Sequence, residues 1–183
     1  MELTATYIFS QVFFLINYIL LMTTYQIKNR KVIVFFNLCG CISMMLAYIL
    51  LKAYAGLAMV FVSIARNIIF MIDEKINGKN DITTKKDFII MAVLIIACML
   101  CAIPTYESIW SLAAIIATIS YTISATQKNI KVYRWMGIIS GLSWIVYNLY
   151  IKSIIGVIFE VVLLVAVVVG LVRYYKGEKA KVE

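Results

Sequence analysis

The sequence contains no histidine, the side chain that most often acts as a general base or binds zinc. It also lacks paired carboxylates and any spacing of a nucleophile with a base, which acid–base or covalent catalysis would require. Neither a zinc-binding pattern nor a phosphate-binding glycine loop is present. The sequence therefore argues against an enzyme and predicts no metal and no cofactor.

Signals for cleavage and lipid attachment are missing as well. No basic residue precedes the first apolar run, although a secretory signal needs a positive segment there. The second residue is Glu2, where myristoylation needs glycine, and the chain ends without a prenylation box. We expect the first apolar run to be retained, so that the protein spans the membrane and is not merely anchored to it.

Charged residues are scarce, at 14% of the 183 residues, whereas 64% are hydrophobic and the mean hydropathy is +0.97. Soluble domains are about 45–50% apolar. A soluble fold of this length could not bury so much apolar surface, so we expect a lipid bilayer around it. The net charge of +8 lies mostly in short loops between apolar runs, so nucleic-acid binding is not expected.

The apolar runs predict an all-α, polytopic membrane protein with seven transmembrane helices in a single domain, 1–183. A spanning helix needs roughly 17–25 mostly apolar residues. Seven segments satisfy this requirement: 4–25, 32–51, 54–72, 88–104, 107–126, 132–151 and 154–174. The stretches 32–72 and 132–172 are too long for one crossing, so each must fold back where lysine and glycine interrupt it.

The basic residues predict the orientation of the helices. Cytoplasmic loops of membrane proteins are enriched in lysine and arginine. Fourteen of the seventeen basic residues lie in alternate loops and the C-terminal tail, the opposite loops hold only Lys52 and Lys152, and Arg66 lies within a run. We therefore expect the N-terminus outside and the C-terminus in the cytoplasm.

Residues also recur at an offset of 100 positions, which indicates an internal repeat. The matches are Lys28-Asn29 with Lys128-Asn129, Lys31-Val32 with Lys131-Val132, Ser43 with Ser143, Lys52 with Lys152, Gly56 with Gly156, and Val62 with Val162. They predict a three-helix unit (4–72), a linker helix (88–104) and a second unit (107–174). A single linker helix gives both units the same orientation, so the repeats are expected to be parallel.

Two charged residues, Arg66 and Glu160, lie inside predicted spans, where charge is costly and usually functional. Arg66 belongs to the cytoplasmic half of its helix and leans toward the level of Glu160. A direct or water-mediated pair between the units would then form a shared polar site. Alternatively, each side chain extends to the nearer membrane surface.

Uncharged polar residues extend this hypothesis. Serines and threonines in the spans, and the Gly137-x-x-x-Gly141 pattern, are expected mainly to pack helices and to hydrogen-bond between them. For the larger polar residues, packing and solute binding remain equally open. The candidate substrate-binding residues are Asn17, Arg66, Asn67, Trp144, Tyr147, Asn148 and Glu160.

Cys98-x-x-Cys101 resembles a redox or zinc motif but lies inside an apolar run. Without a histidine, and without a loop to present a thiolate, these cysteines are expected to pack as soft apolar side chains, as are Cys39 and Cys41.

The second unit contains Lys131-Val-Tyr-Arg-Trp-Met, Ser143-Trp-Ile-Val-Tyr-Asn148, Lys152-Ser-Ile-Ile-Gly156 and Glu160, and the first contains Ser63-Ile-Ala-Arg66-Asn67. These segments resemble the YgjV-type bacterial inner membrane protein family, which implies the bacterial inner membrane but no assigned activity. The three-plus-one-plus-three plan resembles the SWEET, PQ-loop and PnuC-like transporters in architecture only. The chain lacks the Pro-Gln dipeptide and the helix prolines of SWEET hinges, so no substrate carries over.

Together these features favour a transporter or facilitator for an unknown small molecule, with its site near mid-depth between the units. Access would alternate as one unit rocks against the other, and Glu160 could carry a proton. The alternative is a receptor or interaction protein that uses the same pocket without transport. Seven helices can stand alone, so an oligomer is optional.

Overall fold

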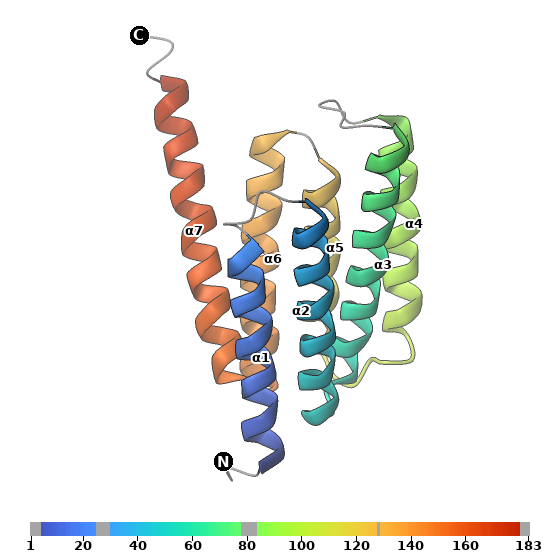
Figure 1. Ribbon diagram of the computed structural model, residues 1–183, viewed down its shortest axis with the longest axis vertical. Helices are drawn as coiled ribbons and strands as arrows, with labels where there is room; N and C mark the ends of the chain where they lie inside the picture. The colour runs from blue at the N-terminus through green and yellow to red at the C-terminus, as the bar shows by residue number, and fades with distance from the viewer. Residues whose placement is uncertain (1–4, 25–29, 78–83, 128, 180–183) are drawn as a thin grey trace.

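The computed structural model describes residues 5–24, 30–77, 84–127 and 129–179, in which all regular structure is helical (Figure 1). The helices are α1 (Ala5–Thr24), α2 (Arg30–Leu50), α3 (Tyr54–Asn77), α4 (Lys85–Ala102), α5 (Ser111–Thr126), α6 (Ile130–Tyr150) and α7 (Ile154–Lys179). Each predicted apolar run overlaps one of these helices, so the all-α prediction is confirmed for the described residues. The largest boundary differences are that α3 and α7 continue about five residues further and α5 begins four residues later.

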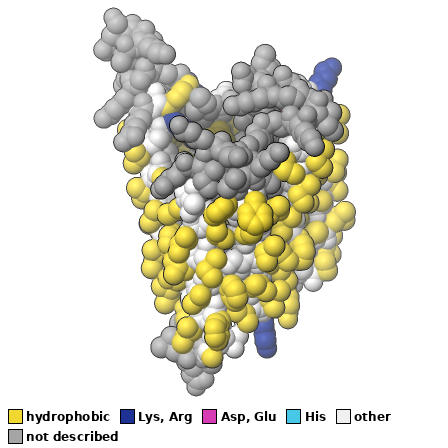
Figure 2. Space-filling view, viewed as in Figure 1, with side chains coloured by type: hydrophobic (Ala, Val, Ile, Leu, Met, Phe, Trp, Pro, Cys, Tyr) yellow, Lys and Arg dark blue, Asp and Glu magenta, His cyan; other side chains and the backbone are white. Residues whose placement is uncertain are grey.

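The surface of the bundle is apolar. Large hydrophobic side chains point outward from every helix, and some are more than half exposed, such as Phe9, Ile89 and Ile103. Figure 2 shows these side chains covering the visible flank between the two ends. Such a surface is suited to lipid and not to water.

In the described residues, three helices are long and apolar enough to cross a membrane, over Ala5–Thr23, Tyr54–Asp73 and Ile154–Val172. Two shorter apolar helices cover Phe35–Leu50 and Ser111–Thr126. The membrane-protein character of the sequence is therefore confirmed, and seven complete spans stay a prediction.

The helix contacts form a closed ring of six helices. α1 contacts α2, α2 contacts α3, α3 contacts α5, α5 contacts α6, α6 contacts α7, and α7 contacts α1. Helix α4 lies outside this ring, against α3 and α5 (Figure 1). The buried core fills the ring. The contacts of α3 with α5 and of α7 with α1 join the first three helices to the last three and close the ring.

The turns after α2 and α6 have the same hydrogen bonds. Lys52 and Lys152 have positive φ values of 53° and 58°, the left-handed conformation that ends many helices. In each turn the next amide reaches back five residues, from Ala53 N to Tyr48 O and from Ser153 N to Asn148 O, at 2.9 Å in both. These bonds identify two Schellman motifs, which fold each long apolar stretch back on itself as predicted.

Helices α1 and α2 pack closely where a large side chain meets a glycine. A methyl group at Gly40 would lie 2.9 Å from the Asn17 side-chain oxygen, so a larger residue there would force the Asn17 side chain to shift. One hundred positions later, Ala117 of α5 is small and its carbonyl accepts a 2.9 Å bond from Ser140 of α6. In the first pair of helices the α1 residue is large and the α2 residue is glycine, whereas in the second pair the α5 residue is small and the α6 residue is serine. Both helix interfaces are therefore filled.

The residues expected to pack helices do so. Gly137 and Gly141 face α7, where added methyl groups would meet Val167 at 3.6 Å and Leu164 at 3.4 Å. The Cys98 thiol is buried and donates to Met59 Sδ at 3.4 Å. Among the described residues, no group of three or more cysteine and carboxylate side chains could hold a metal ion.

The left-handed turns yield a stability prediction. Replacing Lys152 by glycine should stabilise the protein by about 1 kcal/mol, because a non-glycine residue in this conformation costs about 1–2 kcal/mol. Thermal unfolding in detergent measures the change. Lys85→Gly is the matched control, since this exposed lysine begins α4 and glycine should destabilise a helix. A lower melting temperature for Lys152→Gly would contradict the prediction.

Candidate functional site

A polar seam joins α1 to α7. Tyr7, Gln11, Phe14 and Tyr18 recur at helical spacing and therefore share one face of α1. The Tyr7 hydroxyl donates to the Lys152 carbonyl at 3.0 Å, and the Gln11 side-chain oxygen accepts from the Ile155 amide at 3.0 Å. The seam thus satisfies backbone groups where α7 begins.

Glu160 lies deeper in the same seam and is partly buried. Its carboxylate accepts a 2.9 Å hydrogen bond from the hydroxyl of Tyr18, which is 2% exposed. The Tyr18 ring stacks on Phe159, with ring centroids 4.7 Å apart. Glu160 is therefore held by α1 and does not extend to the outer surface.

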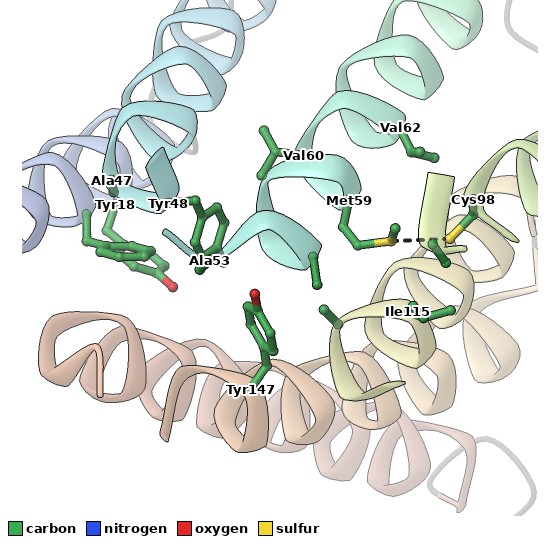
Figure 3. Close-up of a cluster of buried hydrophobic side chains, with 14 residues drawn as sticks. Tyr18, Ala47, Tyr48, Ala53, Met59, Val60, Val62, Cys98, Ile115 and Tyr147 are labelled. Atoms are coloured by element: carbon green, nitrogen blue, oxygen red, sulfur yellow. Dashed lines mark hydrogen bonds between the residues drawn. The ribbon is translucent and has the colours of Figure 1, made fainter. Parts of the chain in front are cut away.

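Aromatic rings from α2 and α6 meet inside the ring of helices (Figure 3). The Tyr48 ring lies 6.4 Å from that of Trp144, nearly parallel, and 6.1 Å from that of Tyr147, edge to face. Tyr48 and Tyr147 are fully buried, whereas Trp144 is partly buried. These contacts join helices that are not neighbours in the ring.

Tyr147 also bonds to the first turn of α3. Its hydroxyl accepts a 2.7 Å bond from the Gly56 amide, and a methyl group at Gly56 would lie 2.8 Å from its ring. At the matching place in α7, the Gly156 amide donates instead to the Ser153 hydroxyl at 3.2 Å. Ala53 has no hydroxyl, so a side chain from α6 satisfies the amide that a local serine satisfies in α7.

Two fully buried side chains have polar atoms without partners in the described residues. They are the Tyr48 hydroxyl and both polar atoms of the Asn148 side chain. Each of these residues is 0% exposed and packs against a glycine of its own hairpin, Gly56 and Gly156 respectively. A buried polar group without a partner costs about 1–3 kcal/mol, so a bound polar molecule would be stabilising here.

Arg66 lies where α3 meets α5 and is 4% exposed. Its guanidinium donates to Thr122 Oγ1 and to Asn67 Oδ1, at 3.4 Å in both cases. The Tyr121 ring covers it, with the guanidinium carbon 4.5 Å from the ring centroid. The alternative in which Arg66 extends to the cytoplasmic surface is therefore wrong.

The two buried charges have different neighbours. Arg66 is held by α5, Glu160 is held by α1, and no ion pair joins them among the described residues. The direct pair considered from the sequence is therefore not formed. Each charge instead lies at one of the two helix contacts that close the ring.

Asn17 lies apart from these residues, between α1 and α2. Its side-chain amide donates to Met44 Sδ at 3.8 Å, and its oxygen contacts Gly40. Several hydroxyls likewise bond neighbouring helices: Ser43 to the Phe13 carbonyl at 2.8 Å, and Ser124 to the Tyr133 carbonyl at 2.8 Å. Packing therefore accounts for Asn17 and for these serines.

Sequence reasoning missed Tyr18 and Tyr48, which contact or flank the candidate residues. Aromatic residues are common in membrane helices, so neither stands out by type. One signal was available: Tyr48 is 100 positions before Asn148, so a polar side chain recurs at the same place in the repeat. For Tyr18, the spacing with Tyr7 and Gln11 marked a polar face of α1.

The family model Imp-YgjV, described as a bacterial inner membrane protein, matches residues 8–178. The chain belongs to this family. Among curated proteins and among solved structures, no similar protein matches it. Like its family, this Imp-YgjV protein is an integral, multi-pass protein of the bacterial inner membrane, which confirms the predicted resemblance and location.

In this Imp-YgjV protein, the Tyr147–Gly56 bond yields a prediction with a rescue. Tyr147→Phe should destabilise the protein by about 1–3 kcal/mol, because the buried Gly56 amide loses its acceptor. Adding Ala53→Ser should recover part of the loss by supplying the hydroxyl that Ser153 provides in α7. Thermal unfolding in detergent checks both variants. Equal stability of Tyr147→Phe and the natural protein would show that the bond contributes nothing.

Proposed function

We propose that this protein carries a small polar solute across the inner membrane, binding it between two three-helix units. The units are α1–α3 and α5–α7, which correspond to the predicted ranges 4–72 and 107–174 except that α3 and α7 continue about five residues further, and α4 links them. Both units have the same orientation, with the N-terminus outside and the C-terminus in the cytoplasm.

The order of helix contacts supports this division. Adding the offset of 100 residues converts α1, α2 and α3 into α5, α6 and α7. The same operation converts the contact of α1 with α2 into that of α5 with α6, and of α2 with α3 into that of α6 with α7. The contact of α3 with α5 corresponds to that of α7 with α1, as expected of two units related by a two-fold axis. The matching turns at Lys52 and Lys152 add local support.

The observation that carries the proposal is the pair of unsatisfied side chains, Tyr48 and Asn148. They occupy the same position in the two units and are fully buried. A hydroxyl and an amide together offer donors and acceptors to a polar solute. Trp144 and Tyr147 would supply the apolar faces against which it packs.

Alternating access requires contacts between the units that can break. Three such contacts are the bonds of Tyr18 with Glu160, of Tyr147 with Gly56, and of Arg66 with Thr122. Most other contacts lie within a unit, so the units could rock as bodies around the site. Glu160 is suited to carry a proton, because breaking its bond to Tyr18 would expose the carboxylate to whichever side is open.

A receptor that binds the same solute without moving it is the second candidate. The dense packing of Tyr48 and Tyr147, which are 0% and 1% exposed, favours this function, because a closed interior suits a binding protein. Ligand-dependent thermal stabilisation that survives Glu160→Gln, without flux, would identify it.

The proposed orientation predicts the behaviour of reporter fusions. Alkaline phosphatase fused after Tyr106, between α4 and α5, should be active because that loop faces the periplasm. Green fluorescent protein should fluoresce at the C-terminus and stay dark after Tyr106. The reverse pattern would overturn the orientation without affecting the fold.

The proposed site predicts an effect on uptake without an effect on stability. Tyr48→Phe removes a hydroxyl that bonds to nothing in the described residues, so the melting temperature should not fall. Uptake into proteoliposomes should fall about tenfold, the equivalent of one lost hydrogen bond to the solute. Sugars, amino acids, nucleosides and vitamins are the solutes to screen.

Ser143→Ala is the matched control, because among the described residues the Ser143 hydroxyl bonds within α6, to Ile139 O. This variant should retain uptake. If the folded protein moves none of the four solute classes, transport is contradicted. If uptake occurs and Tyr48→Phe leaves it unchanged, the site is misplaced although transport stands.

A further inference from the structure

Arg66 is a buried cation whose hydrogen bonds are incomplete. A guanidinium has five N–H donors, and good N–H···O bonds are about 2.7–3.2 Å long. The two that Arg66 makes, to Thr122 and Asn67, are both 3.4 Å long. Its Nε is buried and has no partner in the described residues. The cation is therefore under-satisfied inside the membrane, where such a group is costly.

No described carboxylate neutralises Arg66. Asp73 is two turns further along the same helix, but its carboxylate pairs with Lys86 of α4. Glu160 bonds to Tyr18 on the other side of the ring. Buried charges are normally paired, and a lone one is strongly destabilising. Among the described residues, Arg66 therefore has no carboxylate partner.

A cavity lies next to this charge. It measures about 40 Å³ and is lined by Asn37, Leu38, Asn67 and Ile68, from α2 and α3. Asn67 both lines the cavity and accepts a 3.4 Å hydrogen bond from Arg66, so one side chain links the guanidinium to the cavity. Two of the four lining side chains are amides, which can donate hydrogen bonds to an oxygen anion.

We propose that Arg66, Asn67 and Asn37 bind the anionic oxygen group of a ligand, a carboxylate or a phosphate. Arginine matches both groups geometrically, because its planar fork can donate two parallel bonds to their oxygens. The cavity holds such a group but not a whole sugar or nucleoside, so the rest of the ligand must extend from it. The conclusion that the transported solute is an anion rests on the proposed transport function. The binding of an anion at Arg66 does not depend on transport.

The location of the cavity suits an anion. It lies about two turns before Asp73 on α3, and the sequence predicts that the end of α3 beyond Asp73 faces the side of the membrane with most of the basic residues. That charge would concentrate anions near the cavity. The group could come from a soluble solute or from an anionic phospholipid, because both present the same oxygens.

The test is thermal stabilisation of the purified protein by defined anions. The soluble probes are sodium phosphate, acetate and succinate in a neutral detergent, each compared with sodium chloride at equal ionic strength. The lipid probe is phosphatidylglycerol in nanodiscs, compared with phosphatidylcholine. Saturation at ten times the dissociation constant should raise the melting temperature by about 3–6 °C.

Three variants identify the site. Arg66→Gln should abolish the shift and Asn37→Leu, which fills the cavity, should reduce it. Ser143→Ala should retain the shift, because the Ser143 hydroxyl bonds to Ile139 O within α6. Should Arg66→Gln not fold, the shift of the natural protein and its reduction in Asn37→Leu remain measurable.

A shift with phosphate or a carboxylate that Arg66→Gln loses supports a soluble ligand. A shift confined to phosphatidylglycerol and lost in the same variant supports a lipid ligand. The inference is overturned if no probe shifts the melting temperature. It is also overturned if Arg66→Gln and Asn37→Leu both show the same shift as the natural protein. Because these measurements detect binding and not flux, failure of transport in proteoliposomes is recognised separately.

Discussion

The two seams that close the ring of helices, between α1 and α7 and between α3 and α5, determine much of the interior. In lipid, a polar group must find its partner within the protein, since no water is available. The first seam meets this need with the bond of Tyr18 to Glu160, whereas the second meets it only in part, with the 3.4 Å bond of Arg66 to Thr122. Because each buried charge lies at a seam, the same residues that hold the ring together are placed where its halves could separate.

The matching hairpins have different side chains at the same backbone position. Ser153 satisfies the first turn of α7 locally, whereas Ala53 leaves that task in α3 to Tyr147. Tyr48 and Asn148 follow the opposite pattern, because both keep polar atoms unsatisfied. The backbone therefore repeats, while the side chains connect α6 to α3 on one side only. The interior is therefore asymmetric, because the bond of Tyr147 to Gly56 crosses between the units whereas its counterpart at Gly156 is local.

Helix positions and the two reversals could be predicted, because both follow from local features. Run length and composition located the helices, and lysine followed by glycine marked the turns at Lys52 and Lys152. The partners of Arg66 and Glu160 could not be predicted in this way. The depth of a side chain along its helix can be counted from the sequence. Which neighbouring helix the side chain faces depends on how helices distant in sequence pack.

The sequence by itself determined that the chain lies in a membrane, since its apolar content exceeds what a fold of this size can bury. It also determined which side chains would be costly there. Only the tertiary structure decided that Arg66 and Glu160 lie apart, because the closing contacts turn one toward α5 and the other toward α1. Likewise, only packing between α2 and α6 enclosed Tyr48 and Asn148 without partners.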